Sequence, residues 1–355
     1  MISQETIRRI LEISIQAPSG SNSQPWRFEV KGNQINVFAM PGLDNPILNF
    51  RHRGTWLAHG ALLENIIITS SVFRYEPTCS LFPDSNNRNL VVRILFKESS
   101  PKENPLYPFI PLRVTNRKPY LLRSLTEQQK IELFNIAREA TDAELKLIEE
   151  KDKINQTAEA ESKGEIVLFG NRLLHKFFFE KVVWSHKEEQ KKWRVFYVKT
   201  KELKPPQQIA LRFFKYWPIM NFFNKFGMTK IIARVSSKKY AASSAMGVIV
   251  VENKDENFIT AGRLMQRLWL TATKLGLSFQ LLTLVPFLWQ RIESGDTKGF
   301  SKEHIKLINN AYHQIASLFN VADEAKIIAL LFRIGYGGKP SAQSIKKPPE
   351  IIFHG

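Results

Sequence analysis

Ala17-Pro18-Ser19-Gly20-Ser21-Asn22-Ser23-Gln24-Pro25-Trp26-Arg27-Phe28 joins two segments that differ in hydrophobic period. An apolar pattern with helical spacing precedes this stretch, and an alternating pattern typical of a strand follows it. Proline fixes φ and lacks an N–H, while glycine tolerates positive φ, so the two prolines and the glycine predict a stiff turn. Ser19, Ser21, Asn22 and Gln24 present several hydrogen-bond donors and acceptors from this one loop. A plain helix-to-strand connector is the alternative interpretation.

Composition excludes several classes of protein. The chain has 355 residues and 43% hydrophobic content, enough for one large domain or two ordinary ones. A single cysteine, Cys79, excludes an internal disulfide and a cysteine metal cluster, and the seven histidines show no metal-ligand spacing. The amino terminus lacks the apolar core of a signal peptide, and no apolar run approaches the roughly 18 residues of a membrane helix. We therefore expect a cytoplasmic protein without a metal.

The positive charge is concentrated in one segment. The net charge is +18, and residues 186–239 hold 14 Lys or Arg against 3 acidic residues, a difference of +11. Such a block can meet nucleic acid, an anionic membrane or a phosphorylated small molecule. No helix-turn-helix, zinc-finger or RNA-binding signature accompanies it, so we expect no nucleic-acid partner.

Aromatic residues are interspersed among these cations. Residues 205–227 contain Phe213, Phe214, Tyr216, Trp217, Phe222, Phe223 and Phe226. Three interpretations stay open: a lid over a bound ligand, an amphipathic surface that makes peripheral contact with anionic lipid, or packing on the core. Pro218 interrupts any single helix through the segment.

Hydrophobic periodicity predicts a mixture of helices and strands. Helices are predicted over residues 6–16, 53–73, 127–140, 158–185 and 258–275, the third behind a capping box at Ser124–Glu127. Strands are predicted over residues 28–30, 35–38, 90–96, 144–149, 248–252, 278–285 and 327–334, the first two as a hairpin. Residues 101–111 contain four prolines and no periodicity, and they form the best candidate linker.

The order helix, strand, helix, strand occurs twice, with weak internal similarity. When residues 58–72 are aligned with residues 260–274, Gly60 falls on Gly262 and Thr69 on Thr271. A chance likeness between two amphipathic helices is the alternative. We predict two related halves, residues 1–100 and 112–355, joined by the linker 101–111, with the basic aromatic segment at about 186–239 as an insertion in the second half.

The opening stretch closely resembles the P-S-x-x-N-x-Q-P-W element of the nitroreductase family of FMN-dependent oxidoreductases. The resemblance implies an α+β fold, an α/β/α sandwich, in which two related halves surround one FMN site. Members are usually homodimers in which an R-x-S-x-R/K element of one subunit and the P-S-x-x-N loop of the other hold each flavin. Each element occurs once here, which resembles the single-chain duplicated branch that includes proteins proposed to sequester flavin. A monomer built as a fused pseudo-dimer is therefore expected, with further dimerisation left open.

The resemblance assigns cofactor-binding roles to residues far apart in the chain. The arginine element corresponds to Arg113, Thr115 and Arg117, and the loop to Pro18, Ser19, Gly20 and Asn22. Lys346 and Lys347 resemble a basic element that closes the phosphate site, with a solvated tail as the alternative. Leu282, Thr283 and Leu284 match the stretch that places a backbone N–H at flavin N5, with a plain core strand as the alternative. Arg117 is expected near flavin N1 as an electrostatic tuner.

The implied activity is hydride transfer from NADH or NADPH through FMN N5 to a small-molecule acceptor such as a nitro-aromatic or a quinone. No protein nucleophile or general base is required, and none is evident. The alternative is a flavin-binding protein that stores or sequesters FMN beneath a lid, with little turnover.

Overall fold

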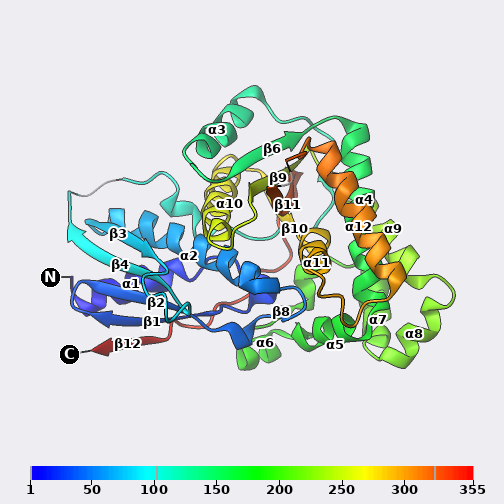
Figure 1. Cartoon of the computed structure of the whole chain (residues 1–355), viewed down its shortest axis with the longest axis horizontal. Coiled ribbons are helices and arrows are strands. Elements are labelled where there is room, and N and C mark those ends of the chain that lie inside the picture. Colours follow the sequence, from blue (N-terminus) through cyan, green and yellow to red (C-terminus); the bar gives the residue numbers. More distant parts are fainter. Residues whose placement is uncertain (1, 101–102, 324, 355) are drawn as a thin grey trace.

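The computed structural model describes residues 2–100, 103–323 and 325–354, which form two mainly antiparallel sheets separated by packed helices (Figure 1). The first sheet has the strand order β12-β1-β2-β4-β3 and the second has the order β10-β11-β9-β6. The strands of the first sheet are β1 (Trp26–Lys31), β2 (Gln34–Ala39), β3 (Tyr75–Leu81), β4 (Leu90–Glu98) and β12 (Ile351–His354). Those of the second are β6 (Glu144–Ile148), β9 (Ala245–Glu252), β10 (Ser278–Leu282) and β11 (Lys326–Gly337), with β5 (Tyr120–Leu121) paired to the end of β11. The short pair β7 (Val182–Val183) and β8 (Phe196–Tyr197) stands apart.

The helices fall into two groups. Those that pack against the sheets are α1 (Gln4–Ser14), α2 (Arg53–Val72), α3 (Glu127–Arg138), α10 (Asn257–Lys274), α11 (Leu284–Glu293) and α12 (Lys302–Leu318). Between β6 and β9 lie α4 (Lys151–Gly170), α5 (Arg172–Lys181), α6 (His186–Lys192), α7 (Pro205–Phe214), α8 (Trp217–Asn224) and α9 (Met228–Ala241). None of the helices in the described parts of the chain is long and apolar enough to cross a membrane.

Four strands in each sheet follow the same path. The order β1-β2-β4-β3 corresponds to β6-β9-β11-β10, and every neighbouring pair along both paths is antiparallel. A helix also precedes the first strand and follows the second in each case: α1 and α2 in the first, α3 and α10 in the second. The connections differ, because β1 and β2 are joined by residues 32–33, whereas residues 149–244 separate β6 from β9.

The central helices α2 and α10 cross at two glycines, and the contacts are reciprocal. A Cβ atom on Gly60 would lie 2.0 Å from the carbonyl oxygen of Ile259, and one on Gly262 would lie 2.1 Å from that of Leu57. Leu57 precedes Gly60 by three residues, and Ile259 precedes Gly262 by three residues. The two helices therefore make the same contact in both directions, and the crossing is symmetric. Any side chain here would separate their backbones.

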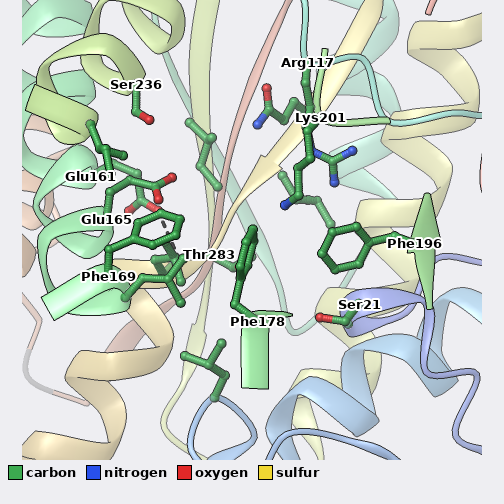
Figure 2. A pocket seen from close by; sticks show the side chains of 18 of the residues that line it. Ser21, Arg117, Glu161, Glu165, Phe169, Phe178, Phe196, Lys201, Ser236 and Thr283 are labelled. Atoms are coloured by element: carbon green, nitrogen blue, oxygen red, sulfur yellow. Dashed lines mark hydrogen bonds between the residues drawn. The ribbon is translucent and has the colours of Figure 1, made fainter. Parts of the chain in front are cut away.

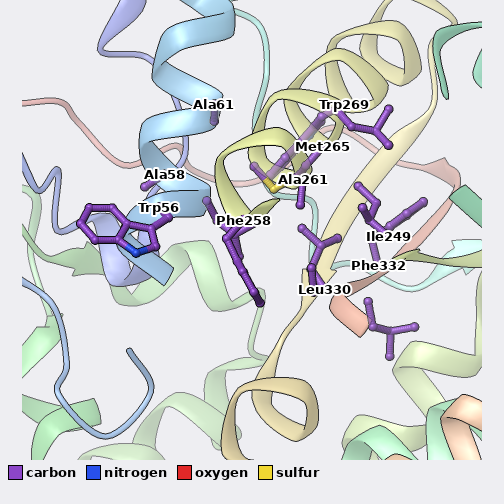
Figure 3. Close-up of a cluster of buried hydrophobic side chains, with 14 of the residues drawn as sticks. Trp56, Ala58, Ala61, Ile249, Phe258, Ala261, Met265, Trp269, Leu330 and Phe332 are labelled. Atoms are coloured by element: carbon purple, nitrogen blue, oxygen red, sulfur yellow. The ribbon is translucent and has the colours of Figure 1, made fainter. Parts of the chain in front are cut away.

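The main core fills the space between this helix pair and the second sheet. Figure 3 shows Phe258, Met265 and Trp269 of α10 lying between α2 and the strands that carry Ile249 and Phe332. The rings of Trp269, Phe279 and Phe332 are stacked, with successive centroids 4.9 and 4.5 Å apart. This packing fixes how the two sheets are oriented, because α2 belongs to one path and α10 to the other.

The predicted hairpin and the five other predicted strands are present, and three predicted boundaries were wrong. The helix predicted over residues 158–185 begins earlier, at Lys151, and is split at Asn171, whose side chain caps α5. The strand predicted over residues 278–285 ends at Leu282, because α11 starts at Leu284. The capping box lies two residues further on than predicted, since Thr126 and Gln129 form it.

The segment predicted as a linker is packed where the structure describes it. Residues 101–102 lie outside the described residues. Leu106 and Ile110 are buried against Ile68 of α2 and Leu270 of α10. Apolar burial on the two central helices therefore holds this proline-rich stretch in place.

Candidate functional site

The loop between α1 and β1 has a constrained backbone. Ser21, Asn22 and Gln24 adopt positive φ angles of 49°, 60° and 48°. Non-glycine residues rarely take this conformation, and clusters of it occur where a backbone is held in place for a function. The Ser19 hydroxyl accepts a hydrogen bond from the Gln24 N–H at 2.9 Å, which closes the turn.

Hydrogen bonds to the carboxy-terminal segment hold the loop in place. The Asn22 side-chain amide donates to the carbonyl oxygens of Val195 and Ile345, at 3.1 and 2.9 Å. The Gln24 side-chain oxygen accepts from the Lys347 N–H at 2.9 Å. The chain then runs into β12, which pairs in parallel with β1. The loop is therefore fixed by contacts with residues more than 170 positions away in the sequence.

A narrow cavity of about 170 Å³ lies beside this loop. Its charged lining residues are all cations: Arg113, Arg117, Lys201 and Lys346. No Asp or Glu is among the described residues that line it. Hydroxyl groups of Ser19, Ser21 and Thr115 complete the lining. Four basic side chains without a carboxylate make this cavity a candidate site for an anion, because buried charge is normally compensated by a partner of opposite sign.

Arg113 is the most deeply buried of these cations, at 6% exposure. One terminal nitrogen donates to the Gln16 carbonyl at 2.8 Å, and the guanidinium lies 4.4 Å from the Trp269 ring centroid. Its Nε has no hydrogen-bond partner among the described residues. Burial lowers the pKa of Arg113 to about 10, which leaves it charged at neutral pH. The unsatisfied N–H and the uncompensated charge both favour binding of an anion.

Lys346 and Lys201 extend the positive charge along the cavity. The Lys346 ammonium donates to the Ala17 carbonyl and to the Asn22 side-chain oxygen, both at 2.9 Å. Burial, with a further contribution from the Arg113 charge, holds the Lys346 pKa well below its ordinary value. Burial and the neighbouring Arg117 charge lower the pKa of Lys201 to about 7. A bound anion would reverse these shifts, because it favours the charged form of each amine.

A wide cavity of about 500 Å³ adjoins the narrow one, and Ser21, Arg117, Phe196 and Lys201 line both. Figure 2 shows Arg117 and Lys201 on one side of the wide cavity and Glu161 and Glu165 on the other. Between them the walls are mostly apolar and aromatic: Leu168, Phe169, Phe177, Phe178, Leu211, Phe214, Ile231 and Ile232. The volume falls within the roughly 300–1,000 Å³ typical of small-molecule sites.

Glu161 is a buried carboxyl group on the wall formed by α4. Its Oε1 accepts a hydrogen bond from the Leu284 N–H at 3.0 Å, at the start of α11, while Oε2 has no partner among the described residues. Burial raises the pKa of Glu161 to about 8. One turn further along α4, Glu165 accepts from the Tyr240 hydroxyl at 2.9 Å. Glu161 is therefore protonated at neutral pH, beside the end of β10.

The structure brings most of the sequence-predicted residues to these two cavities. Pro18, Ser19, Asn22, Arg113, Thr115, Arg117 and Lys346 line the narrow cavity. Gly20, Arg117, Leu282, Thr283 and Leu284 line the wide one. Lys347 does not belong to either, because its side chain points to Glu350, with Nζ 3.7 Å from the carboxylate. Leu284 also differs from the prediction, since it opens a helix rather than ending a strand.

Sequence reasoning missed Lys201, Glu161 and Glu165. Lys201 is one of 14 cations in residues 186–239, and nothing local distinguishes it. Glu161 did carry a signal, because it is three residues after Ala158 and seven before Leu168 on the buried face of α4. An acidic residue at an apolar helical position indicates a buried carboxyl group with an altered pKa.

Together the two cavities suit one kind of ligand. The narrow, cationic end fits a small dianion such as a phosphate, and the wide end fits a flat apolar ring system attached to it. Both lie between the loop of the first sheet and elements of the second, so neither sheet forms the site alone.

Comparisons with known sequences find distant relatives. No family model matches the chain. An uncharacterized protein of Mycobacterium tuberculosis is 21% identical over 290 residues, which cover 81% of this chain and 40% of that protein. A second protein of that species, named "Putative NAD(P)H nitroreductase", is 27% identical over 118 residues, which cover 33% of this chain and 34% of that protein. The chain spans two-fifths or less of the length of these curated relatives.

Solved structures with related elements include several FMN proteins. A nitroreductase with bound FMN from Desulfitobacterium hafniense gives a TM-score of 0.36 at 11% identity, covering 70% of this chain and 94% of that one. An iodotyrosine deiodinase bound to FMN and 3-iodo-L-tyrosine gives 0.37 at 12% identity, covering 68% and 95%. A BluB-like flavoprotein from Clostridium difficile gives 0.37 at 12% identity, covering 68% and 94%. TM-scores of this size do not define a shared fold, so the assignment of a ligand depends on the residues of this chain.

Proposed function

We propose that the chain is an FMN-binding oxidoreductase of the nitroreductase type. The observation that carries the proposal is the narrow cavity, where four cations and no carboxylate meet the hydroxyl-rich loop beside a wide apolar cavity. The FMN phosphate carries about two negative charges, which the guanidinium and ammonium groups would neutralise. The motif resemblance and the similarity to a relative named as an NAD(P)H nitroreductase support the same assignment.

We also propose that the chain is a fused pseudo-dimer, with residues 1–100 and 112–355 as related halves. The matching strand paths and the reciprocal contacts of Gly60 and Gly262 support this relation. The loop at residues 18–22 comes from the first half, whereas Arg113, Thr115 and Arg117 open the second. A contact made between subunits in dimeric proteins would then lie within one chain.

The residues of the site have separate tasks in this scheme. Arg113, Lys346 and Thr115 bind the phosphate, and the backbone of the loop limits how far it can enter. Arg117 lines both cavities, so its guanidinium borders the junction at which the ring system would begin. Leu282, Thr283 and Leu284 form the wall on which the ring would rest, with Glu161 fixing the Leu284 N–H. When bound, FMN supplies hydride transfer between a nicotinamide and a small-molecule acceptor such as a quinone or nitro-aromatic.

Anaerobic reduction of the bound flavin tests this function. The purified protein is loaded with FMN, freed of excess cofactor, and mixed with NADH or NADPH while the flavin absorbance is followed. We expect bleaching by at least one nicotinamide and recovery when an acceptor such as a quinone is added. Failure to bind FMN would contradict both the proposed cofactor and the proposed activity.

A second candidate is flavin storage, and one observation favours it. Leu211 and Phe214 of α7 and Ile231 and Ile232 of α9 close one side of the wide cavity. Helices in this position act as a lid that keeps a nicotinamide from the ring. Protein that binds FMN tightly but stays oxidised with both nicotinamides would support storage over turnover.

A further inference from the structure

Helices α7, α8 and α9 carry apolar side chains on their solvent face. Eight large apolar residues of residues 209–235 are between 40% and 72% exposed: Ile209, Phe213, Tyr216, Phe222, Phe223, Phe226, Ile231 and Val235. We call this set the exposed apolar patch. A soluble helix normally turns its apolar side inward, so three successive helices with outward apolar residues indicate a surface that meets a partner.

The spacing shows that the outward residues form stripes. On α7, Ile209 and Phe213 follow the i, i+4 spacing of one helical face, and Tyr216 lies just beyond the end of that helix. Phe222 and Phe226 repeat the i, i+4 spacing, and so do Ile231 and Val235. The rings of Phe222 and Phe226 lie 5.3 Å apart and form a cluster at the surface.

The opposite faces of the helices attach them to the body. Met220 of α8 and Ala233 of α9 are buried, and the Asn224 side chain donates to the Phe169 carbonyl at 2.9 Å. The His175 ring nitrogen lies 2.7 Å from the Phe214 carbonyl. The helices therefore have a fixed inner face, and they lie at the end of the molecule opposite the two termini (Figure 1).

The charge around the patch has one sign. Residues 203–244 contain eight Lys or Arg and no Asp or Glu. Seven of these cations are exposed: Lys204, Arg212, Lys215, Lys225, Lys230, Arg234 and Lys238. None of the seven forms an ion pair with a described residue, although such pairs are common elsewhere on the surface. This unpaired positive charge attracts anionic partners.

We propose that this patch docks the protein on an anionic lipid bilayer, lying in the interface without crossing it. Aromatic and aliphatic side chains between lysines are the composition of interfacial membrane helices, in which rings enter the headgroup layer and cations contact acidic lipids. A second copy of the chain would bring the same positive surface against this one. Aliphatic residues such as Ile209 and Val235 do not stack on bases, which favours lipid over single-stranded nucleic acid.

Docking would also place the wide cavity against the bilayer. Ile231 and Val235 belong to the exposed apolar patch and line the wide cavity as well. An apolar acceptor dissolved in the lipid could then enter directly, a consequence that rests on the proposed function. The docking itself requires no flavin, so the two proposals can fail separately.

Vesicle flotation with the full chain tests the docking. Phosphatidylcholine vesicles containing phosphatidylglycerol are compared with pure phosphatidylcholine vesicles at low and high salt. We expect flotation with the anionic vesicles, weakened by salt and by the double variants Phe222→Ser with Phe226→Ser and Lys225→Glu with Lys230→Glu, each by at least about tenfold. Leu121→Ser with Leu122→Ser is the matched control, since both side chains are exposed outside the patch.

Three results would overturn the proposal. Equal binding to both kinds of vesicle, or none, would remove the role of anionic lipid. A dimer in light scattering that the Phe222 and Phe226 variant dissolves would make the patch a contact between copies. Tight binding to a single-stranded oligonucleotide, lost in the same variant, would assign the patch to nucleic acid. Circular dichroism and a thermal melt show that each variant is folded, without reference to FMN binding.

Discussion

The two sheets share one strand path but differ in their connections. In the first sheet, residues 15–25 between α1 and β1 form the constrained polar loop, and β1 turns into β2 through residues 32–33. In the second sheet, residues 139–143 between α3 and β6 contain no proline or serine, and six helices separate β6 from β9. The first sheet contributes a rigid loop, whereas the second contributes the walls of a cavity.

This difference explains why we propose a single site in a molecule with two similar sheets. A second site would need the loop at residues 139–143 and an arginine element near the start of the chain, and both are missing from the sequence. A titration with FMN should therefore reach one equivalent per chain. The connection between β6 and β9 carries α7, α8 and α9 and with them the exposed apolar patch.

The largest expected effect concerns the crossing of α2 and α10, which joins the two sheets. Gly262→Ala would place a methyl group about 2.1 Å from the Leu57 carbonyl oxygen, and the backbones would have to move apart. We expect the free energy of unfolding in urea to fall by roughly 3–5 kcal/mol. Gly60→Ala should have a similar effect because its contact is reciprocal.

Gly42→Ala is the control for these variants, since no atom lies within 4 Å of a Cβ there. It should change the free energy of unfolding by less than about 0.5 kcal/mol. If Gly262→Ala and Gly42→Ala had the same urea midpoint, the close crossing of α2 and α10 would be wrong.

A second prediction concerns Glu161, which lies on α4 in the connection between β6 and β9. Its pKa is about 8 in the folded chain and about 4.5 in the unfolded chain. The folded state therefore binds more protons at Glu161 between these values, so the contribution of Glu161 to stability is fully present below about pH 4.5 and is lost as the pH rises to about 8. We expect a loss on the order of 4 kcal/mol across this range, since one pKa unit corresponds to about 1.36 kcal/mol.

Glu161→Gln should remove most of that pH dependence, because the amide keeps an acceptor for Leu284 but cannot ionise. Urea unfolding at several pH values measures it, and the variant should be the more stable protein above about pH 8. An unchanged slope would show that Glu161 is ionised when folded.

A third prediction contrasts neighbouring residues of the same type. Arg113→Ala should weaken FMN binding by roughly 1.5–3 kcal/mol, the value of a charge-assisted hydrogen bond. Lys346→Ala should also weaken it, whereas Lys347→Ala should not, because only Lys346 lines the narrow cavity. Fluorescence titration of FMN measures all three. Equal losses for Lys346 and Lys347 would contradict the position of the phosphate.

The smallest expected effect is a proton taken up on binding. Lys201 has a pKa of about 7 without a ligand, and a bound phosphate would raise it. Above pH 7 the free amine is partly neutral, so FMN binding should take up a fraction of a proton, and affinity should fall by less than about 1 kcal/mol per pH unit. Calorimetry in buffers of different ionisation enthalpy measures this uptake. Lys201→Met should abolish it, and persistence of the uptake would assign it to another group.

Much of the fold was predictable because its signals are local. Alternating residues around Gly32 gave the first hairpin, and helical periodicity gave α2 and α10 to within a few residues. The predicted ends of helices and strands were wrong where a single side chain determines the boundary. Asn171 ends one helix and caps the next, and Glu161 accepts from the first N–H of α11, which converts the end of a predicted strand into a helix.

The candidate site also has a part that the sequence predicts and a part that depends on tertiary structure. The sequence by itself determined the loop, the arginine element and the excess of cations, because residue type and short spacing set their chemistry. Only the tertiary structure decided which cations face one another, since the crossing of α2 and α10 and the pairing of β12 with β1 bring distant segments together. Lys346 and Lys347 are chemically identical neighbours, yet one turns toward Asn22 and the other toward Glu350. Adjacent residues in an extended chain point to opposite sides, and the contacts that set this register come from the other end of the molecule.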